Sequence, residues 1–185
     1  HNSGRRQRQM CIRDSQSSDK RILEIGFGDG ENLISSAQNN LNFFFFGVEV
    51  YEMGVANILK SMETNGISNV KIILGDVKEV LEKNFVEDYF DEILIFFPDP
   101  WPKRKHNKRR LVSEDFLFEI KKILKKDGVL IIKTDWKEYA EEIEQNVKKV
   151  FGRYKKSLDK KSNLVTKYEK IALKENRKIT SFETY

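Results

Sequence analysis

A strand–helix alternation begins at Arg21-Ile22-Leu23-Glu24-Ile25-Gly26-Phe27-Gly28-Asp29-Gly30. Its first five residues are mostly apolar and predict a strand, and the three glycines that follow predict a tight turn that brings the backbone close to a ligand. The spacing is G-x-G-x-G, with Glu31 next, so it differs from the G-x-G-x-x-G dinucleotide fingerprint. The turn alone is a weak signal, since any tight strand-to-helix connection would use it.

Strand and helix patterns alternate beyond this turn. Further strands are predicted at 42–50, 70–74, 91–97 and 129–133, and apolar residues at helical spacing separate them. Ser113 is predicted to cap a helix whose inner face includes Leu124 and which Gly128 closes, and Asp135 is predicted to cap the next helix. From Arg153 the pattern weakens, and strands are predicted at 164–173 and 178–182.

Repeated strand–helix units imply an α/β fold with a mostly parallel sheet and helices on both faces. The 185 residues suit one domain, which we place at 20–185. Residues 1–19 are polar and arginine-rich, and we interpret them as a disordered or non-native leader. Ligands bind such sheets at the carboxyl ends of the strands, so functional residues are expected directly after the strands.

Composition narrows the classes of function. The longest apolar run is too short to span a bilayer, and the start of the chain lacks the apolar core of a secretory signal. One cysteine excludes an internal disulfide and, with only two histidines, argues against a structural zinc site. We therefore expect a cytoplasmic protein with no membrane segment and no metal, either a monomer or a homodimer.

Positive charge is concentrated in one place. Six of the 34 basic residues lie within 103–110, and the remaining 28 are balanced by 29 acidic residues. A solvated helix face is the usual explanation of such a run. Here the concentration favours a phosphate-binding surface and a polyanionic partner.

Acidic residues follow or end three successive predicted strands. Glu24 is either half of an internal ion pair or a ligand contact, because a buried carboxylate needs a partner. Glu49 is placed to accept hydrogen bonds from a ribose diol, or is simply a solvated strand end. Asp76 is either a helix N-cap, with Glu79 as its capping-box partner, or an acceptor for the amine of adenine. Together they predict a nucleoside cofactor.

The fourth strand leads into Pro98-Asp99-Pro100-Trp101. An acid fixed between two prolines beside an aromatic ring is suited to binding a flat base. The purely structural alternative is a rigid surface turn. Two further polar groups could bind a ligand or have a structural role only. The structural role would be a helix cap for Asp135 and part of an edge strand for Thr166-Lys167-Tyr168-Glu169.

Seven segments resemble the bacterial tRNA (guanine-N7)-methyltransferases, which use S-adenosylmethionine. The match runs in order from about Arg21 to the end of the chain, and its most specific parts are the P-D-P-W and H-N-K-R-R sequences. The segments are Leu23–Gly28, Gly47–Val50, Gly75-Asp76, Phe97–Lys103, His106–Arg110, Lys133–Asp135 and Thr166–Glu169.

The resemblance implies a Rossmann-like class I methyltransferase fold, with a seven-stranded sheet whose last strand is antiparallel. It implies methyl transfer from S-adenosylmethionine to N7 of the guanine at position 46, in the variable loop of tRNA. Asp99 would be the catalytic residue. Cofactor contacts would come from Glu24, Gly26, Gly28, Glu49, Asp76 and Asp99. Substrate contacts would come from Lys103, Asp135, Thr166, Lys167, Tyr168 and Glu169. RNA contacts would come from Lys105, His106, Asn107, Lys108, Arg109 and Arg110.

Two other functions stay open on the residues alone. One is methylation of another nucleic acid base, because proline-bracketed loops of this kind also resemble those of amino-methylating enzymes. The other is a non-catalytic RNA-binding module on a Rossmann-like fold. A nicotinamide dehydrogenase is disfavoured by the glycine spacing and by the lack of a residue suited to proton transfer.

Overall fold

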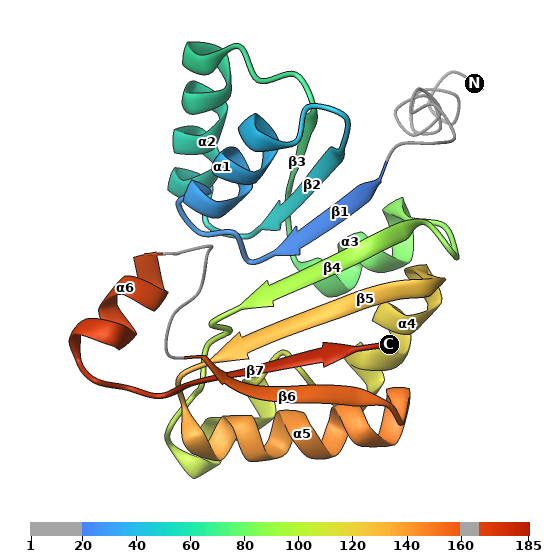
Figure 1. Ribbon diagram of the computed structural model, residues 1–185, viewed down its shortest axis with the longest axis vertical. Helices are drawn as coiled ribbons and strands as arrows, with labels where there is room; N and C mark the ends of the chain where they lie inside the picture. The colour runs from blue at the N-terminus through green and yellow to red at the C-terminus, as the bar shows by residue number, and fades with distance from the viewer. Residues whose placement is uncertain (1–19, 160–166) are drawn as a thin grey trace.

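A computed structural model describes residues 20–159 and 167–185. In Figure 1 a twisted sheet forms the middle layer, with α1 and α2 on one face and α3, α4 and α5 on the other. The interpretation of residues 1–19 as a leader lies outside the described residues. None of the described helices is both long and apolar enough to cross a membrane.

The described strands form one seven-stranded sheet in the order β3-β2-β1-β4-β5-β7-β6. All pairings among β1 to β5 are parallel, whereas β7 runs antiparallel to both β5 and β6. The expected sheet, mostly parallel with an antiparallel last strand, is therefore confirmed. The strands are β1 (Arg21–Ile25), β2 (Phe44–Glu49), β3 (Val70–Leu74), β4 (Phe90–Phe96), β5 (Leu124–Thr134), β6 (Tyr154–Asp159) and β7 (Ile179–Thr184).

Local signals account for several helix ends. Gly66 ends α2 in the left-handed conformation, with φ 63°. Ser113 caps α4 by accepting from the Phe116 N–H, and Asp76 caps α3 by accepting from the Lys78 N–H. The helices are α1 (Glu31–Asn39), α2 (Glu52–Asn65), α3 (Val77–Asn84), the 3₁₀ helix η1 (Arg104–Arg109), α4 (Glu114–Ile123), α5 (Lys137–Phe151) and α6 (Lys167–Lys174).

Alternation along the strands separates two cores. In β1, Leu23 and Ile25 pack with α3, α4 and α5, whereas Ile22 packs with α1 and α2. Because neighbours on a strand point to opposite faces, Glu24 shares the α1 face with Ile22. β4 pairs in parallel with β1 on one side and with β5 on the other. The same face of the sheet therefore continues across these three strands up to their carboxyl ends.

Two predicted helix boundaries are wrong. α4 ends at Ile123, and Leu124 has extended backbone angles and pairs with Phe90 of β4, so β5 begins before Gly128. The N-cap of α5 is Trp136 without a side-chain cap, because the Asp135 carboxylate pairs with Arg177 instead.

The C-terminal prediction is partly wrong. Residues 167–174, predicted as strand, form α6, while β7 confirms the last predicted strand. β6 was not predicted, and it pairs with β7 at the edge of the sheet. Its sequence, Tyr-Lys-Lys-Ser-Leu-Asp, lacks apolar alternation because lysines occupy the exposed edge, which is a common protection of edge strands.

Candidate active site

The glycine turn after β1 is built from left-handed backbone. Gly26, Gly28 and Gly30 have φ values of 72°, 57° and 76°, a region that side chains with a Cβ rarely adopt. Gly54 of α2 lies against this turn so closely that a Cβ there would stand 2.3 Å from the Gly28 carbonyl oxygen. The turn and the start of α2 therefore fit together through backbone contact.

Glu49, at the end of β2, ties these parts together. Its carboxylate is buried and accepts backbone N–H groups from Gly28 (2.8 Å), Val50 (2.7 Å) and Tyr51 (3.0 Å). The Gly28 bond uses Oε2 and the other two use Oε1. Since each carboxylate oxygen has two acceptor sites, Oε2 keeps one site for a further donor such as a hydroxyl group.

Glu24 is buried without a cationic partner among the described residues. It is 3% exposed, and the Asn32 amide donates to its carboxylate at 2.8 Å. Burial raises the pKa of Glu24 to about 7, which the bond from Asn32 only partly offsets. An internal ion pair, one of the two predicted alternatives, is absent from the described part of the chain, and the site suits a ligand that brings a positive charge.

A pocket opens at the end of β1 on the α1 face. It joins two predicted cofactor residues, Glu24 and Gly26, to the predicted substrate residue Tyr168 of α6. Seven further residues line it that were not assigned a contact from the sequence, although Gly30 belongs to the predicted glycine turn. They are Phe27, Asp29, Gly30, Glu31, Asn32, Phe96 and Phe97.

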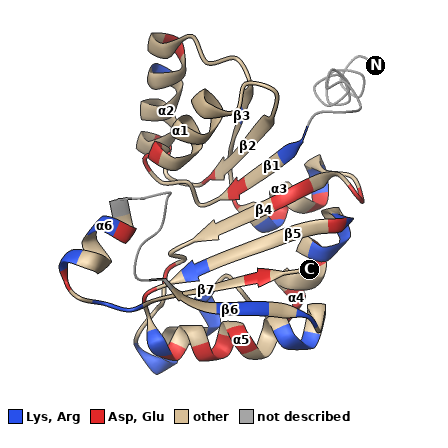
Figure 2. Ribbon diagram, in the orientation of Figure 1, with Lys and Arg blue, Asp and Glu red and all other residues tan. Residues whose placement is uncertain are grey.

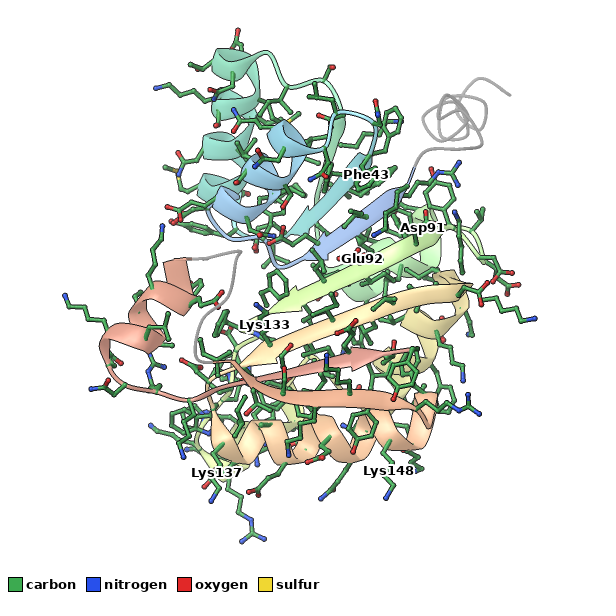
Figure 3. The ribbon with its side chains drawn as sticks, in the orientation of Figure 1. Phe43, Asp91, Glu92, Lys133, Lys137 and Lys148 are labelled. Atoms are coloured by element: carbon green, nitrogen blue, oxygen red, sulfur yellow. The ribbon has the colours of Figure 1, made fainter. Side chains whose placement is uncertain are left out.

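Helix α6 is held at this end of the sheet by three consecutive side chains, of which Tyr168 lines the pocket. The Tyr168 ring stacks on Phe97 after β4, with centroids 6.3 Å apart. Glu169 is 1% exposed and its Oε2 lies 3.8 Å from Nζ of Lys133, a buried lysine of β5 that Figure 3 labels at the strand end facing α6. Lys170 pairs with Glu31 of α1 at 3.4 Å. The Thr166 prediction lies outside the described residues.

The loop after β4 holds strained backbone on both sides of Asp99. Phe97 and Trp101 have φ values of 52° and 43°, and each directly precedes a proline. Such conformations cost roughly 1–3 kcal/mol each and persist only where surrounding contacts enforce them. Asp99 itself is exposed, and none of the described residues donates a hydrogen bond to its carboxylate.

Side chains of η1 brace this loop from the other end. Arg109 lies over the Trp101 ring, 4.9 Å from its centroid, and His106 meets the same ring edge-on at 6.0 Å. With its amide nitrogen turned toward them, Asn107 donates to the carbonyl groups of Lys103 (3.2 Å) and Trp101 (3.1 Å). One face of the Trp101 ring, the aromatic ring beside Asp99, is therefore covered by an arginine.

The lysines and arginines among the predicted RNA-binding residues fall into two groups. Lys105, Lys108 and Arg109 are exposed, as is the predicted substrate residue Lys103, so these cations are accessible to phosphates. Arg110 is only 5% exposed and points into the protein. Its burial is at odds with a direct contact to RNA, and the charge run gave no sign of the difference.

Other predicted residues are spread around the same edge of the sheet. Asp76 is exposed and uses Oδ1 to cap α3, so Oδ2 stays open to a ligand. Asp135 is half-buried and pairs with Arg177, which precedes β7. Of the predicted site residues that the structure describes, Glu24, Gly26 and Tyr168 line one pocket, whereas Asp76, Asp99 and Asp135 lie after other strands.

The sheet has five parallel strands, and the β7–β6 pair extends it, with β7 as its one reversed strand among those described. This is the arrangement of the class I S-adenosylmethionine-dependent methyltransferases. Solved structures agree. Phosphoethanolamine N-methyltransferase 2 from Haemonchus contortus, in complex with S-adenosyl-L-methionine, matches with a TM-score of 0.63 over 91% of this chain and 49% of that chain, at 17% identity. At this identity the likeness concerns the fold alone.

Sequence comparison places the chain more narrowly. A family model described as "Putative methyltransferase" matches residues 18–182. A tRNA (guanine-N(7)-)-methyltransferase from Buchnera aphidicola is 42% identical over 85% of this chain and 69% of its own length. The enzyme of that name from Wolbachia pipientis wMel is 39% identical over 90% of this chain and 76% of its own. The chain belongs to the tRNA (guanine-N(7)-)-methyltransferase family.

Proposed function

We propose that this protein transfers the methyl group of S-adenosylmethionine to N7 of a guanine in tRNA, at position 46 of the variable loop. The observation that supports the proposal is that the acidic residues, the glycine turn and the exposed cations lie at one edge of the sheet. The chain is also 42% identical to a tRNA (guanine-N(7)-)-methyltransferase. A tRNA substrate would place this work in the cytoplasm.

The described residues fit the cofactor. Glu24 is a buried carboxylate with one amide donor, and a ligand ammonium group would supply the positive charge that it lacks. Glu49 keeps an acceptor site for a ribose hydroxyl, and Asp76 keeps Oδ2 for an adenine amine. Gly26 and Gly28 let the backbone approach the ligand without a Cβ in the way.

Chemistry at guanine N7 asks little of the protein beyond alignment. The nitrogen has a lone pair and no proton to lose, so no general base is needed. Bound S-adenosylmethionine supplies a methyl group already activated by its sulfonium. The protein must hold the base in line with that methyl group, and geometry of this kind lowers a barrier substantially.

Asp99 has the properties of the catalytic residue. Its carboxylate is exposed at the end of β4 and has no partner among the described residues, so it can accept N–H bonds from guanine. Methylation leaves the ring cationic, and a carboxylate beside it stabilises the charge that develops in the transition state. Lys103, Lys105, Lys108 and Arg109 would hold phosphates on either side of the base.

Nucleoside analysis tests the proposal. The protein is incubated with methyl-labelled S-adenosylmethionine and tRNA that lacks modifications, and the digested RNA is separated by chromatography. Label in 7-methylguanosine, and its loss when guanine 46 is replaced by adenine, is the expected result. Label in another base would favour the alternative methyltransferase, and no label despite cofactor binding would reject the enzymatic proposal.

A further inference from the structure

Arg110 differs from the other cations of 103–110 in where its side chain goes. Its side chain is 4% exposed. Nε donates to the Pro100 carbonyl oxygen at 2.8 Å, and Nη1 donates to the Glu142 carboxylate of α5. The guanidinium also lies over the Tyr139 ring, 4.9 Å from its centroid. These contacts use the planar face and two separate donors of the arginine.

Hydrogen bonds tie the part of α5 that Arg110 contacts to the segment after η1. Tyr139 is fully buried, and its hydroxyl oxygen accepts from the Val112 N–H at 3.0 Å. Asn146, two turns further along α5, donates to the Val112 carbonyl oxygen at 3.0 Å. Burial raises the pKa of Tyr139 to about 12, so the ring stays neutral over the working pH range. Arg110 thus connects the loop to an element that is itself fixed.

Pro100 is a sensitive point for such a connection. It directly follows Asp99 and directly precedes Trp101, whose backbone is in the strained left-handed region. Strained backbone relaxes when its enforcing contacts are lost. A bond to the Pro100 carbonyl therefore acts on the peptide unit that sets the position of the Asp99 carboxylate.

We propose that Arg110 is a positioning residue, which holds the Pro100 carbonyl against α5 and so fixes Asp99 for the reaction. The proposal rests on the proposed function for its kinetic consequence, though not for its structural one. Buried Arg110 is not expected to bind phosphate, whereas the exposed Lys108, two residues earlier, is.

Only arginine satisfies this geometry. Lysine would keep the charge, but a single ammonium group cannot donate to Pro100 and Glu142 while also stacking flat on Tyr139. With Arg110→Lys the loop is expected to shift, and a displacement of about 1 Å lowers turnover by up to about 100-fold. The tRNA affinity and its dependence on salt are expected to stay near those of the wild type, because no phosphate contact is lost.

The experiment compares Arg110→Lys with Lys108→Ala in the full chain. Arg110→Lys is expected to lower kcat about 10-fold or more with little change in KM. Lys108→Ala is expected to raise KM and to reduce the salt slope of tRNA binding by about 1, with kcat nearly unchanged. A reduced salt slope with unchanged kcat for Arg110→Lys would overturn the proposal.

Hydrogen exchange gives a readout that does not depend on activity. Arg110→Lys should speed amide exchange in peptides covering 97–110, with little change elsewhere in the sheet, and Glu142→Gln should do so to a lesser degree. Unchanged exchange in both variants would overturn the proposal. Glu142→Gln serves as the test if Arg110→Lys fails to fold. A wild-type protein that forms no 7-methylguanosine would reject the proposed function, and exchange would still decide the role of Arg110.

Discussion

The turn after β1 and the loop after β4 both present polar groups at the same sheet edge, but they are held in different ways. The turn is fixed mainly by backbone: left-handed glycines, close contact with Gly54, and the Gly28 N–H, which donates to the Glu49 carboxylate. The loop is fixed by side chains, with Arg109 on Trp101 and Arg110 on Pro100. The turn should therefore fail when a Cβ is added, and the loop when a long side chain is shortened.

Adding a Cβ at Gly54 should break the backbone-held region. In Gly54→Ala the new atom would lie 2.3 Å from the Gly28 carbonyl oxygen, so the turn must move. We expect affinity for S-adenosylmethionine to fall by about 100-fold, equivalent to about 2.7 kcal/mol, measured by calorimetry.

Gly66→Ala is the matched control on the same helix. Gly66 is left-handed but has no atom within 4 Å of an added Cβ. It should lower the free energy of unfolding by about 1 kcal/mol and leave the cofactor affinity unchanged. Equal cofactor affinity in the two variants would contradict the importance of the backbone contact.

The raised pKa of Glu24 predicts how the stability of the ligand-free protein depends on pH. Burial raises its pKa from 4.5 to about 7, so between these values the folded state keeps a proton that the unfolded state releases. The free energy of unfolding should therefore fall by about 3 kcal/mol as the pH rises through this interval. Denaturant titrations at pH 5 and pH 8 measure it.

Glu24→Gln isolates this contribution, since glutamine keeps the shape and does not titrate. The variant should lose most of the decrease in stability that the wild type shows between the two pH values. The same decrease in both proteins would mean that other groups cause it and that Glu24 is not held in the protonated form.

The smallest effect is expected for a single exposed cation. Lys108 is exposed in η1, and Lys108→Ala should weaken tRNA binding a few-fold while reducing its salt slope by about 1. Lys148→Ala is the matched control, because Lys148 is exposed in the last turn of α5, where Figure 2 shows basic residues and Figure 3 labels it. Arg110, which follows η1, contacts α5 at Tyr139 and Glu142 instead. A salt slope that falls equally in both variants would indicate general charge attraction.

Much of the fold followed from the sequence because it depends on local pattern. The apolar strands, the Gly66 stop and the Ser113 cap are each visible in a few consecutive residues. The failures came where tertiary contacts decide. Asp135 forms an ion pair with Arg177 and does not cap α5. The polar segment of β6 forms a strand because it pairs with β7.

The sequence predicted which residues lie at the ends of the strands, but it did not predict which side chains contact each other there. Glu24, Glu49 and Asp76 could be placed because parallel strands end at one edge. The sequence could not show that Asn32 meets Glu24, that Lys133 meets Glu169, or that Arg110 is buried. A charge run looks uniform in sequence, and only packing against α5 separates Arg110 from Lys108.

The most direct test of the account measures two properties of Asp99→Ala. We predict that this variant forms 7-methylguanosine in unmodified tRNA at least about 100-fold more slowly than the wild type, because transition-state stabilisation is lost. We also predict that the variant still binds S-adenosylmethionine in part, since the turn after β1 stays intact. Near-normal formation of 7-methylguanosine by Asp99→Ala would contradict the account.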